Sequence, residues 1–171
     1  MNNIILVGMP GSGKSTLGVV LARRLGYGFL DTDSFISQKE KSTLQGIIDR
    51  KGLDYFLGTE NEIGSEIVCD RVVIATGGSM VLSDNAMKNL KSLGTVLYIS
   101  VGLDELERRL GNYADRGIAM KDGESLADIF REREPLYLKY ADAVVTYNVG
   151  DDLEATAQNA VKILDSVKAN Y

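Results

Sequence analysis

The sequence predicts an α/β fold in which helices cover both faces of a parallel sheet. Three observations predict it: short, nearly continuous apolar runs, apolar residues at helical spacing between those runs, and a glycine-rich loop directly after the first run. Strands that are apolar on both sides are typical of sheets covered by helices. The alternation of strand and helix favours parallel pairing, and ligands are then expected beyond the carboxyl ends of the strands.

The apolar runs and the helical patterns alternate along the whole chain. We expect strands at Asn3–Val7, Gly28–Leu30, Val72–Ala75, Val96–Ile99 and Ala143–Thr146. Helical spacing is found at Leu17, Val20, Leu21 and Leu25, at Leu126, Ile129 and Phe130, and at Leu153, Ala157, Ala160, Val161 and Leu164. We therefore expect residues 1–171 to form a single domain.

Composition limits the classes of function. The net charge is −5 and no basic stripe is visible, so we expect no nucleic-acid partner. No apolar run approaches the length of a membrane span, and no signal peptide is visible. A single cysteine, Cys69, excludes an intramolecular disulfide and is consistent with a reduced, cytoplasmic location. A monomer is the default expectation.

The chain contains no histidine. Histidine is the commonest general base near neutral pH, so another group must perform any proton abstraction. We expect a carboxylate, a lysine or the substrate itself to do so.

The segment GMPGSGKST, residues 8–16, has the spacing of a phosphate-binding loop. Its glycines allow backbone N–H groups to turn inward around oxygen anions, and the following helix points its positive end at the same place. Lys14 suits the β- and γ-phosphates, and the Ser15 hydroxyl suits Mg²⁺. We expect the nucleotide to be held by Gly8, Gly11, Ser12, Gly13, Lys14, Ser15 and Thr16.

Two carboxylates follow the second predicted strand. Asp31 and Asp33 are two residues apart, so in an extended chain both point toward the site that faces Lys14. One is suited to the hydration shell of Mg²⁺ and the other to accepting a proton from an attacking hydroxyl. The alternative is that Asp33 only caps a helix that begins near Ser34.

Two further segments carry candidate ligand-binding groups. Gly77 and Gly78 follow the third predicted strand and permit a close approach of a ligand to the backbone, although a plain turn would use them too. The long loop at about 111–123 is typical of a lid, and its Arg116 is suited to neutralising charge on a transferring phosphoryl group. A solvated loop arginine is the alternative.

Arg133 lies on the apolar face of a predicted helix, four residues before Tyr137. A guanidinium group there needs an anionic partner, either a structural carboxylate or a substrate carboxylate. Pro135 is expected to kink this helix, or to end it and begin another.

These segments together resemble the shikimate kinase family. GMPGSGKST, DTD, ATGG, Arg116 and REREPLYLKYAD occur in the order and approximate spacing of that family, and the resemblance covers essentially the whole chain. It implies a P-loop kinase fold with a five-stranded parallel sheet and a short lid. It also implies the transfer of a phosphoryl group from ATP, with Mg²⁺, to the small hydroxy acid shikimate, in aromatic amino acid biosynthesis.

The resemblance also implies roles for single residues. Lys14, Asp33 and Arg116 are implied to be catalytic, with Asp33 as the base and Arg116 closing over the phosphates. Ser15 and Asp31 are implied to lie near the metal. The acceptor pocket is implied to involve Asp33, Leu57, Gly77, Gly78, Ser79 and Arg133, with Arg133 holding the acceptor carboxylate.

Two positions depart from the family pattern at the acceptor site. The family usually has F-R-x-x-E where this chain has Phe56 to Glu60, so Leu57 replaces the arginine that binds the shikimate carboxylate, and Ser79 replaces a third glycine. Losing one such charged pair costs on the order of 1.5–3 kcal/mol. Arg133 by itself, Arg50 or Lys51 remain candidates for binding the carboxylate.

Alternative functions are a kinase of another small hydroxy acid or polyol, or a degenerate kinase that binds ATP and acts as a regulator. A nucleotide kinase would be expected to carry more arginines around its acceptor phosphate. A GTP-dependent switch would need an N-K-x-D segment, which this chain lacks.

Overall fold

Five parallel strands form one sheet in the order β2-β3-β1-β4-β5, which confirms the predicted architecture. The computed structural model describes residues 3–111, 117–147 and 150–169. The strands are β1 (Asn3–Val7), β2 (Gly28–Asp31), β3 (Val72–Ala75), β4 (Gly94–Ser100) and β5 (Ala143–Thr146). All five predicted strands are confirmed, and β2 and β4 extend beyond their predicted ends.

The central strand β1 explains the two-layered core. Ile4 and Leu6 face one cluster of buried side chains, whereas Ile5 and Val7 face another, as the alternation of a strand requires. The register places Leu6 beside both Ala75 of β3 and Leu97 of β4. The loops that follow these three strands therefore begin at the same edge of the sheet.

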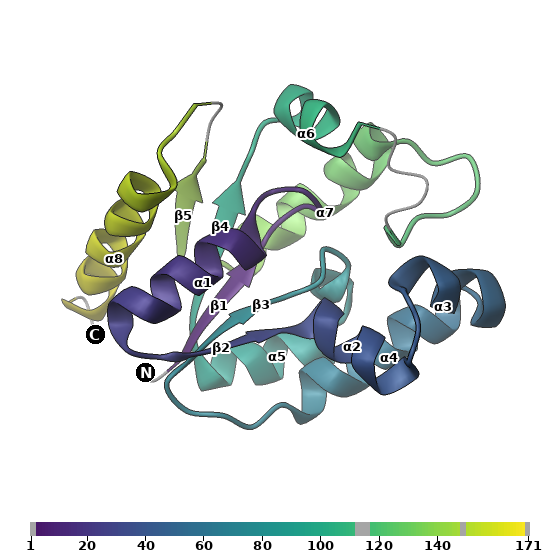
Figure 1. Ribbon diagram of the computed structural model, residues 1–171, viewed down its shortest axis with the longest axis horizontal. Coiled ribbons are helices and arrows are strands. Elements are labelled where there is room, and N and C mark those ends of the chain that lie inside the picture. The colour runs from purple at the N-terminus through teal and green to yellow at the C-terminus, as the bar shows by residue number, and fades with distance from the viewer. Residues whose placement is uncertain (1–2, 112–116, 148–149, 170–171) are drawn as a thin grey trace.

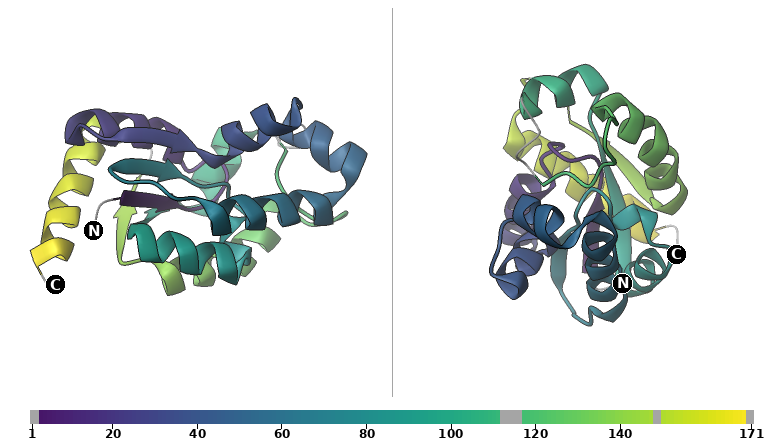
Figure 2. Two further views of the ribbon diagram at one scale, coloured as in Figure 1. Left: turned by 90° about the horizontal axis from the view of Figure 1, so that it is seen from below. Right: turned by 90° about the vertical axis from the view of Figure 1, so that its right-hand side faces the viewer.

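Helices cover both faces of the sheet (Figures 1 and 2). On one face lie α1 (Lys14–Leu25) and α8 (Leu153–Ala169), which enclose Ile4 and Leu6. On the other lie α5 (Asp84–Leu93) and α7 (Leu126–Tyr140), with the short 3₁₀ helix η1 (Met80–Leu82). The α6 helix (Leu103–Leu110) follows β4.

Three further helices stand at the carboxyl end of β2 (Figure 1). They are α2 (Thr32–Glu40), α3 (Leu44–Lys51) and α4 (Leu53–Glu66), and they enclose a third, smaller core of Ile36, Ile47, Phe56, Ile63 and Ala119. Ala119 comes from the segment that precedes α7, so this segment is packed against the three helices. The arrangement builds one wall of a cavity at the edge where β1 and β3 end.

The α7 helix begins at a capping box formed by Ser125 and Asp128, and it runs through Pro135 to Tyr140. The alternative in which Pro135 ends the helix is therefore wrong. A proline inside a helix costs about 3 kcal/mol. Because Arg133 and Tyr137, on either side of Pro135, are buried, we attribute the continuity of the helix to tertiary packing.

Among the described residues, no helix combines the length and the apolar character that crossing a lipid bilayer requires.

Candidate active site

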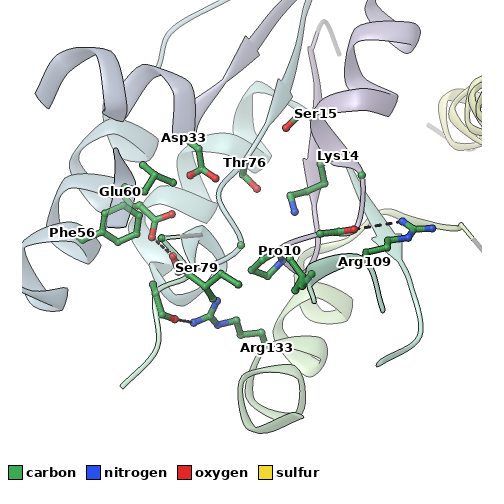
Figure 3. A pocket seen from close by; sticks show the side chains of 18 of the residues that line it. Pro10, Lys14, Ser15, Asp33, Phe56, Glu60, Thr76, Ser79, Arg109 and Arg133 are labelled. Atoms are coloured by element: carbon green, nitrogen blue, oxygen red, sulfur yellow. Dashed lines mark hydrogen bonds between the residues drawn. The ribbon is translucent and has the colours of Figure 1, made fainter. Parts of the chain in front are cut away.

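A cavity of about 400 Å³ lies beyond the carboxyl ends of the strands and collects most of the predicted site residues (Figure 3). One side is formed by the glycine-rich loop after β1, and the opposite side by α2, α4 and the segment before α7. The predicted residues that line it are Gly11, Gly13, Lys14, Ser15, Thr16, Asp33, Gly78, Ser79 and Arg133. The position agrees with the rule that open α/β sheets bind ligands at this edge.

The glycine-rich loop joins β1 to α1 as its motif requires. Gly13 directly precedes the helix and has a φ of +90°, a left-handed backbone conformation that residues other than glycine rarely adopt. The first turn of α1 thus points its N–H groups into the cavity, where anions are favoured. Gly8 and Ser12 do not line the cavity: Gly8 packs against the carbonyl of Ile99, and Ser12 is fully buried in the loop.

Lys14 is 7% exposed and folds along its own loop. Its Nζ donates hydrogen bonds to the carbonyl oxygens of Gly8 (2.8 Å) and Met9 (2.7 Å) and, at 3.3 Å, to the Ser12 hydroxyl. Burial lowers the pKa of Lys14 to about 8, although the nearby Asp33 carboxylate opposes this shift. Phosphate oxygens would be stronger partners for this ammonium group than neutral carbonyls.

Asp31 joins three elements of the site. Its Oδ2 accepts a 2.5 Å hydrogen bond from the Ser15 hydroxyl, and its Oδ1 accepts one from the backbone N–H of Ser34 (2.9 Å). Asp31 is therefore the N-cap of α2, and the alternative that Asp33 caps this helix is wrong. The helix begins at Thr32, two residues earlier than that alternative assumed.

The Ser15 and Asp31 oxygens fit a magnesium ion. Mg²⁺ prefers hard oxygen ligands and is usually held by one or two protein groups together with water and substrate phosphates. In the described part of the chain, no group of three or more acidic, histidine or cysteine side chains forms a separate metal cage. A metal at this position would therefore share its coordination with a phosphate ligand.

Asp33 reaches the cavity by a different route from the one expected. The prediction that the chain is extended from Asp31 to Asp33 is wrong, because Asp33 lies in the first turn of α2. Its Oδ1 is buried and has no hydrogen-bond partner among the described residues. Burial raises the pKa of Asp33 to about 6, and Asp31 adds to this shift while Lys14 opposes it. A carboxylate with this pKa is suited to accepting a proton near neutral pH.

Glu60 on α4 is a cavity residue that the sequence analysis did not single out. It is 1% exposed, and its Oε2 accepts a hydrogen bond from the Ser79 hydroxyl. Burial raises the pKa of Glu60 to about 8, and Asp33 raises it further while Ser79, Arg133 and Lys14 oppose the shift. The missed signal is its position between Phe56 and Ile63, which places a carboxyl group on the apolar face of the helix.

Gly77 packs between two carboxyl groups. A Cβ atom at this position would lie 2.3 Å from Oε1 of Glu60 and 2.5 Å from Oδ1 of Asp33. Only glycine leaves room for both side chains. The groups that closely approach the backbone at Gly77 are therefore the side chains of Glu60 and Asp33, whereas a ligand was predicted there. The neighbouring Gly78 lines the cavity, and its carbonyl accepts a 2.5 Å hydrogen bond from the Tyr137 hydroxyl.

Arg133 is 2% exposed, which confirms its predicted position on the buried face of its helix. Its Nη2 donates to the carbonyl of Ala119, whereas Nε and Nη1 have no hydrogen-bond partner among the described residues. The nearest carboxylate partner is the half-exposed Glu132, 3.9 Å from Nε. The guanidinium group thus keeps two buried donors available at the wall of the cavity.

Three residues considered for the acceptor lie elsewhere. Leu57 lines a neighbouring cavity, together with Glu60 and Ser79. Arg50 donates to the carbonyl of Gly46 in its own helix, and Lys51 pairs with Glu40 and Tyr55. Arg50 and Lys51 do not line the main cavity. The predicted lid residue Arg116 lies outside the described residues.

Arg109 on α6 is a second residue that sequence reasoning missed. Its Nε bonds to Glu105 (2.5 Å), and its Nη1 lies 3.5 Å from the carbonyl oxygens of both Gly11 and Ser12. Its guanidinium group lies 4.7 Å from the centre of the Tyr147 ring. This contact brings α6 and the end of β5 to the phosphate loop, a relationship that local sequence does not reveal.

Comparison with known proteins agrees with this geometry. A family model described as shikimate kinase matches residues 10–167. A shikimate kinase of Paracidovorax citrulli is 34% identical over 168 residues, covering 95% of this chain and 92% of that protein. A shikimate kinase of a Sulfurihydrogenibium species is 32% identical over 169 residues, covering 98% of this chain and 99% of that protein.

Solved structures show the same likeness in three dimensions. The shikimate kinase of Acinetobacter baumannii in complex with shikimate superimposes with a TM-score of 0.89 at 30% identity, covering 97% of this chain and 94% of that one. The shikimate kinase of Aquifex aeolicus has a TM-score of 0.79 at 29% identity, covering 95% and 96% respectively. On the strength of the matched family model and these relatives, the chain belongs to the shikimate kinase family.

Proposed function

We propose that this protein transfers the γ-phosphoryl group of ATP to the 3-hydroxyl of shikimate. The observation that carries the proposal is the placement of Lys14, Asp33 and Arg133 around one cavity, each from a different helix. A phosphate-binding cation, a carboxylate with a raised pKa and a buried guanidinium group with open donors are the groups that this reaction needs. Membership of the shikimate kinase family supports the choice of acceptor.

Asp33 is proposed to act on the attacking hydroxyl. In the transfer, a bond forms between the acceptor oxygen and the γ-phosphorus, and the bond from that phosphorus to the β,γ-bridging oxygen breaks. The hydroxyl proton passes to Asp33, and the electron pair of the broken bond remains on ADP. Because phosphoryl transfer depends mainly on positioning and charge stabilisation, Asp33 also serves by orienting the nucleophile.

Arg133 is proposed to bind the acceptor carboxylate through Nε and Nη1. These donors are buried and unpartnered within the described residues, and a carboxylate accepts two such N–H groups in parallel. The contact would orient the ring of the acceptor, with its acid group at Arg133 and its hydroxyl groups toward Asp33.

The donor side is proposed to hold ATP through the phosphate loop. Lys14 would exchange its hydrogen bonds with loop carbonyls for bonds to the phosphates, and Ser15 and Asp31 would hold Mg²⁺. The metal supplies neutralisation of charge on the β- and γ-phosphates. Arg116 is proposed to add positive charge from the lid.

A cytoplasmic location is proposed because ATP is available there.

A coupled assay of ADP release tests the proposal. The purified protein is supplied with ATP, Mg²⁺ and one acceptor at a time: shikimate, other hydroxy acids, polyols or nucleoside monophosphates. We expect the highest kcat/KM for shikimate, with the product identified by ³¹P NMR as a phosphate monoester. A higher kcat/KM for another acceptor would reject shikimate as the substrate, and a rate of ADP release that no acceptor increases would reject the kinase activity.

A further inference from the structure

The segment 117–119 lines the cavity between α3 and α7, and hydrogen bonds hold both of its ends. All three of its residues are buried. At one end, the backbone N–H of Gly117 donates to Oε1 of Gln45 on α3 (3.1 Å). At the other end, the carbonyl of Ala119 accepts a hydrogen bond from Nη2 of Arg133 on α7. The segment therefore links α3, a surface helix, to the guanidinium group at the cavity wall (Figure 1).

Gly117 lies directly against the first turn of α3. Its φ is +64°, and a Cβ atom at this position would lie 2.7 Å from the backbone nitrogen of Gln45 and would overlap with the side chain of Leu44. Because Gly117 is buried, its N–H needs a partner within the protein. In the described part of the chain that partner is the Gln45 side chain, so the position of Gly117 depends on it.

The amide group of Gln45 is oriented by Asp49, one turn later in α3. Nε2 of Gln45 donates to Oδ1 of Asp49 (2.7 Å), which leaves the amide oxygen facing Gly117. Neither Gln45 nor Asp49 lines the cavity. A pair of this kind adds only slightly to the stability of a helix, so its larger consequence is the placement of Gly117.

The carbonyl of Ala119 orients the guanidinium group of Arg133. Its bond with Nη2 is the one hydrogen bond of this group among the described residues, and Nε and Nη1 stay available. Only Ile118 separates Ala119 from Gly117, and Ile118 is packed in the core beneath the sheet. The segment thus has no slack, and a displacement of Gly117 is passed on to Ala119 and to Arg133.

We propose that Gln45 is a positioning residue for acceptor binding. Held by Asp49, it fixes Gly117, and through the segment 117–119 it sets the carbonyl that orients Arg133. The inference rests on the proposed function, in which Nε and Nη1 of Arg133 bind the acceptor carboxylate. Gln45 itself touches neither substrate.

The test measures KM for shikimate and KM for ATP in Gln45→Met, which keeps the length of the side chain but loses the amide. We expect KM for shikimate to rise roughly threefold to tenfold, the effect of one neutral hydrogen bond. KM for ATP should stay within about twofold, because the phosphate loop and α1 are untouched; a general loss of structure would raise both values. Gln38→Met, at an exposed position in α2, is the matched control and should change neither value.

Exchanging the amide and the carboxylate of the pair gives a second, independent test. Gln45→Glu alone places two carboxylates one turn apart, and their repulsion should raise KM for shikimate as Gln45→Met does. Combined with Asp49→Asn, it restores an oxygen that faces Gly117 and an amide that holds it, with the net charge unchanged. The double variant should therefore return KM for shikimate to near the unaltered value.

Three results would overturn the inference while the proposed function stands. They are an unchanged KM for shikimate in Gln45→Met, an equal rise of both KM values in that variant, and a double variant that remains as impaired as Gln45→Glu. If the unaltered protein does not phosphorylate shikimate, the inference and the proposed function are both rejected.

Discussion

The hydroxyl of Ser15 in α1 donates a 2.5 Å hydrogen bond to Oδ2 of Asp31, the residue at which β2 ends. The other oxygen of Asp31 caps α2. One carboxylate thus fixes the start of the phosphate-binding helix against the helix that carries Asp33. A change in Asp31 that removes its charge acts on the candidate metal position, and a change that removes its cap also acts on the spacing between donor and acceptor sides.

Asp31→Asn is expected to weaken the use of Mg²⁺. Asparagine caps a helix as well as aspartate does, so α2 should stay in place, but the negative charge is lost. We expect the Mg²⁺ concentration for half-maximal rate to rise roughly tenfold or more, as when groups around a metal are altered. The measurement is a Mg²⁺ titration of the rate, with Asp54→Asn in α4 as the control. An unchanged Mg²⁺ requirement would remove Asp31 from the metal site.

Lys14→Met should abolish most turnover without unfolding the protein. Methionine has a similar length and volume but cannot stabilise charge on the phosphates. We expect kcat to fall by roughly a hundredfold to a thousandfold, as for the loss of one charge-stabilising group. Lys88→Met, an exposed residue paired with Asp84, is the control. Turnover that survives in Lys14→Met would contradict the proposed role.

Asp33→Asn should lower kcat far more than it lowers the affinity for ATP. The amide keeps the shape of the side chain but cannot accept the hydroxyl proton, so a loss of roughly a hundredfold to ten thousandfold in kcat is expected. Calorimetric titration with ATP should give a dissociation constant within a few-fold of the unaltered value. A kcat that does not change would exclude Asp33 as the base.

The pH profile of kcat/KM should be bell-shaped, because this parameter reports groups of the free enzyme. Below about pH 6 Asp33 takes up a proton and ceases to be a base, since its pKa is raised to about 6. Above about pH 8 Lys14 loses its charge, since its pKa is lowered to about 8. Initial rates from pH 5 to 9 with both ATP and shikimate well below their KM test both limbs. A profile that stays level from pH 7 down to pH 5 would contradict the assignment of Asp33.

Glu60→Gln should stabilise the protein increasingly as the pH rises. Folded Glu60 keeps its proton up to about pH 8, whereas the unfolded chain releases it near its ordinary value of 4.5. Between these values the unfolded state binds fewer protons, so the free energy of unfolding of the unaltered protein falls with rising pH. Glutamine lacks this contribution and can still accept from Ser79. The free energy of unfolding, measured with urea, should increase in the variant relative to the unaltered protein between pH 5 and pH 8. A difference that stays constant between the two pH values would contradict the raised pKa.

The strands and the phosphate loop could be predicted because their signals are local. Ile4 to Val7 is an unbroken apolar run, and Gly13 and Lys14 occupy motif positions at its end. Arg133 could also be found, since a guanidinium group on an apolar helix face is conspicuous. Asp31 and Asp33 were found as candidates, but their roles at the start of α2 were not, because capping depends on the exact residue at which the helix begins.

Local patterns were enough to predict the alternating α/β order, the parallel sheet, the phosphate-binding loop and a shortlist of acidic and basic groups, because each depends on neighbours in the chain. How these groups meet follows from the packing of the helices around the sheet. This packing places Glu60 of α4 beside Ser79 in the loop after β3, and it places Leu57 at a neighbouring cavity. Contacts between residues far apart in sequence depend on how whole helices pack, and the spacing of residues along one segment does not contain that information.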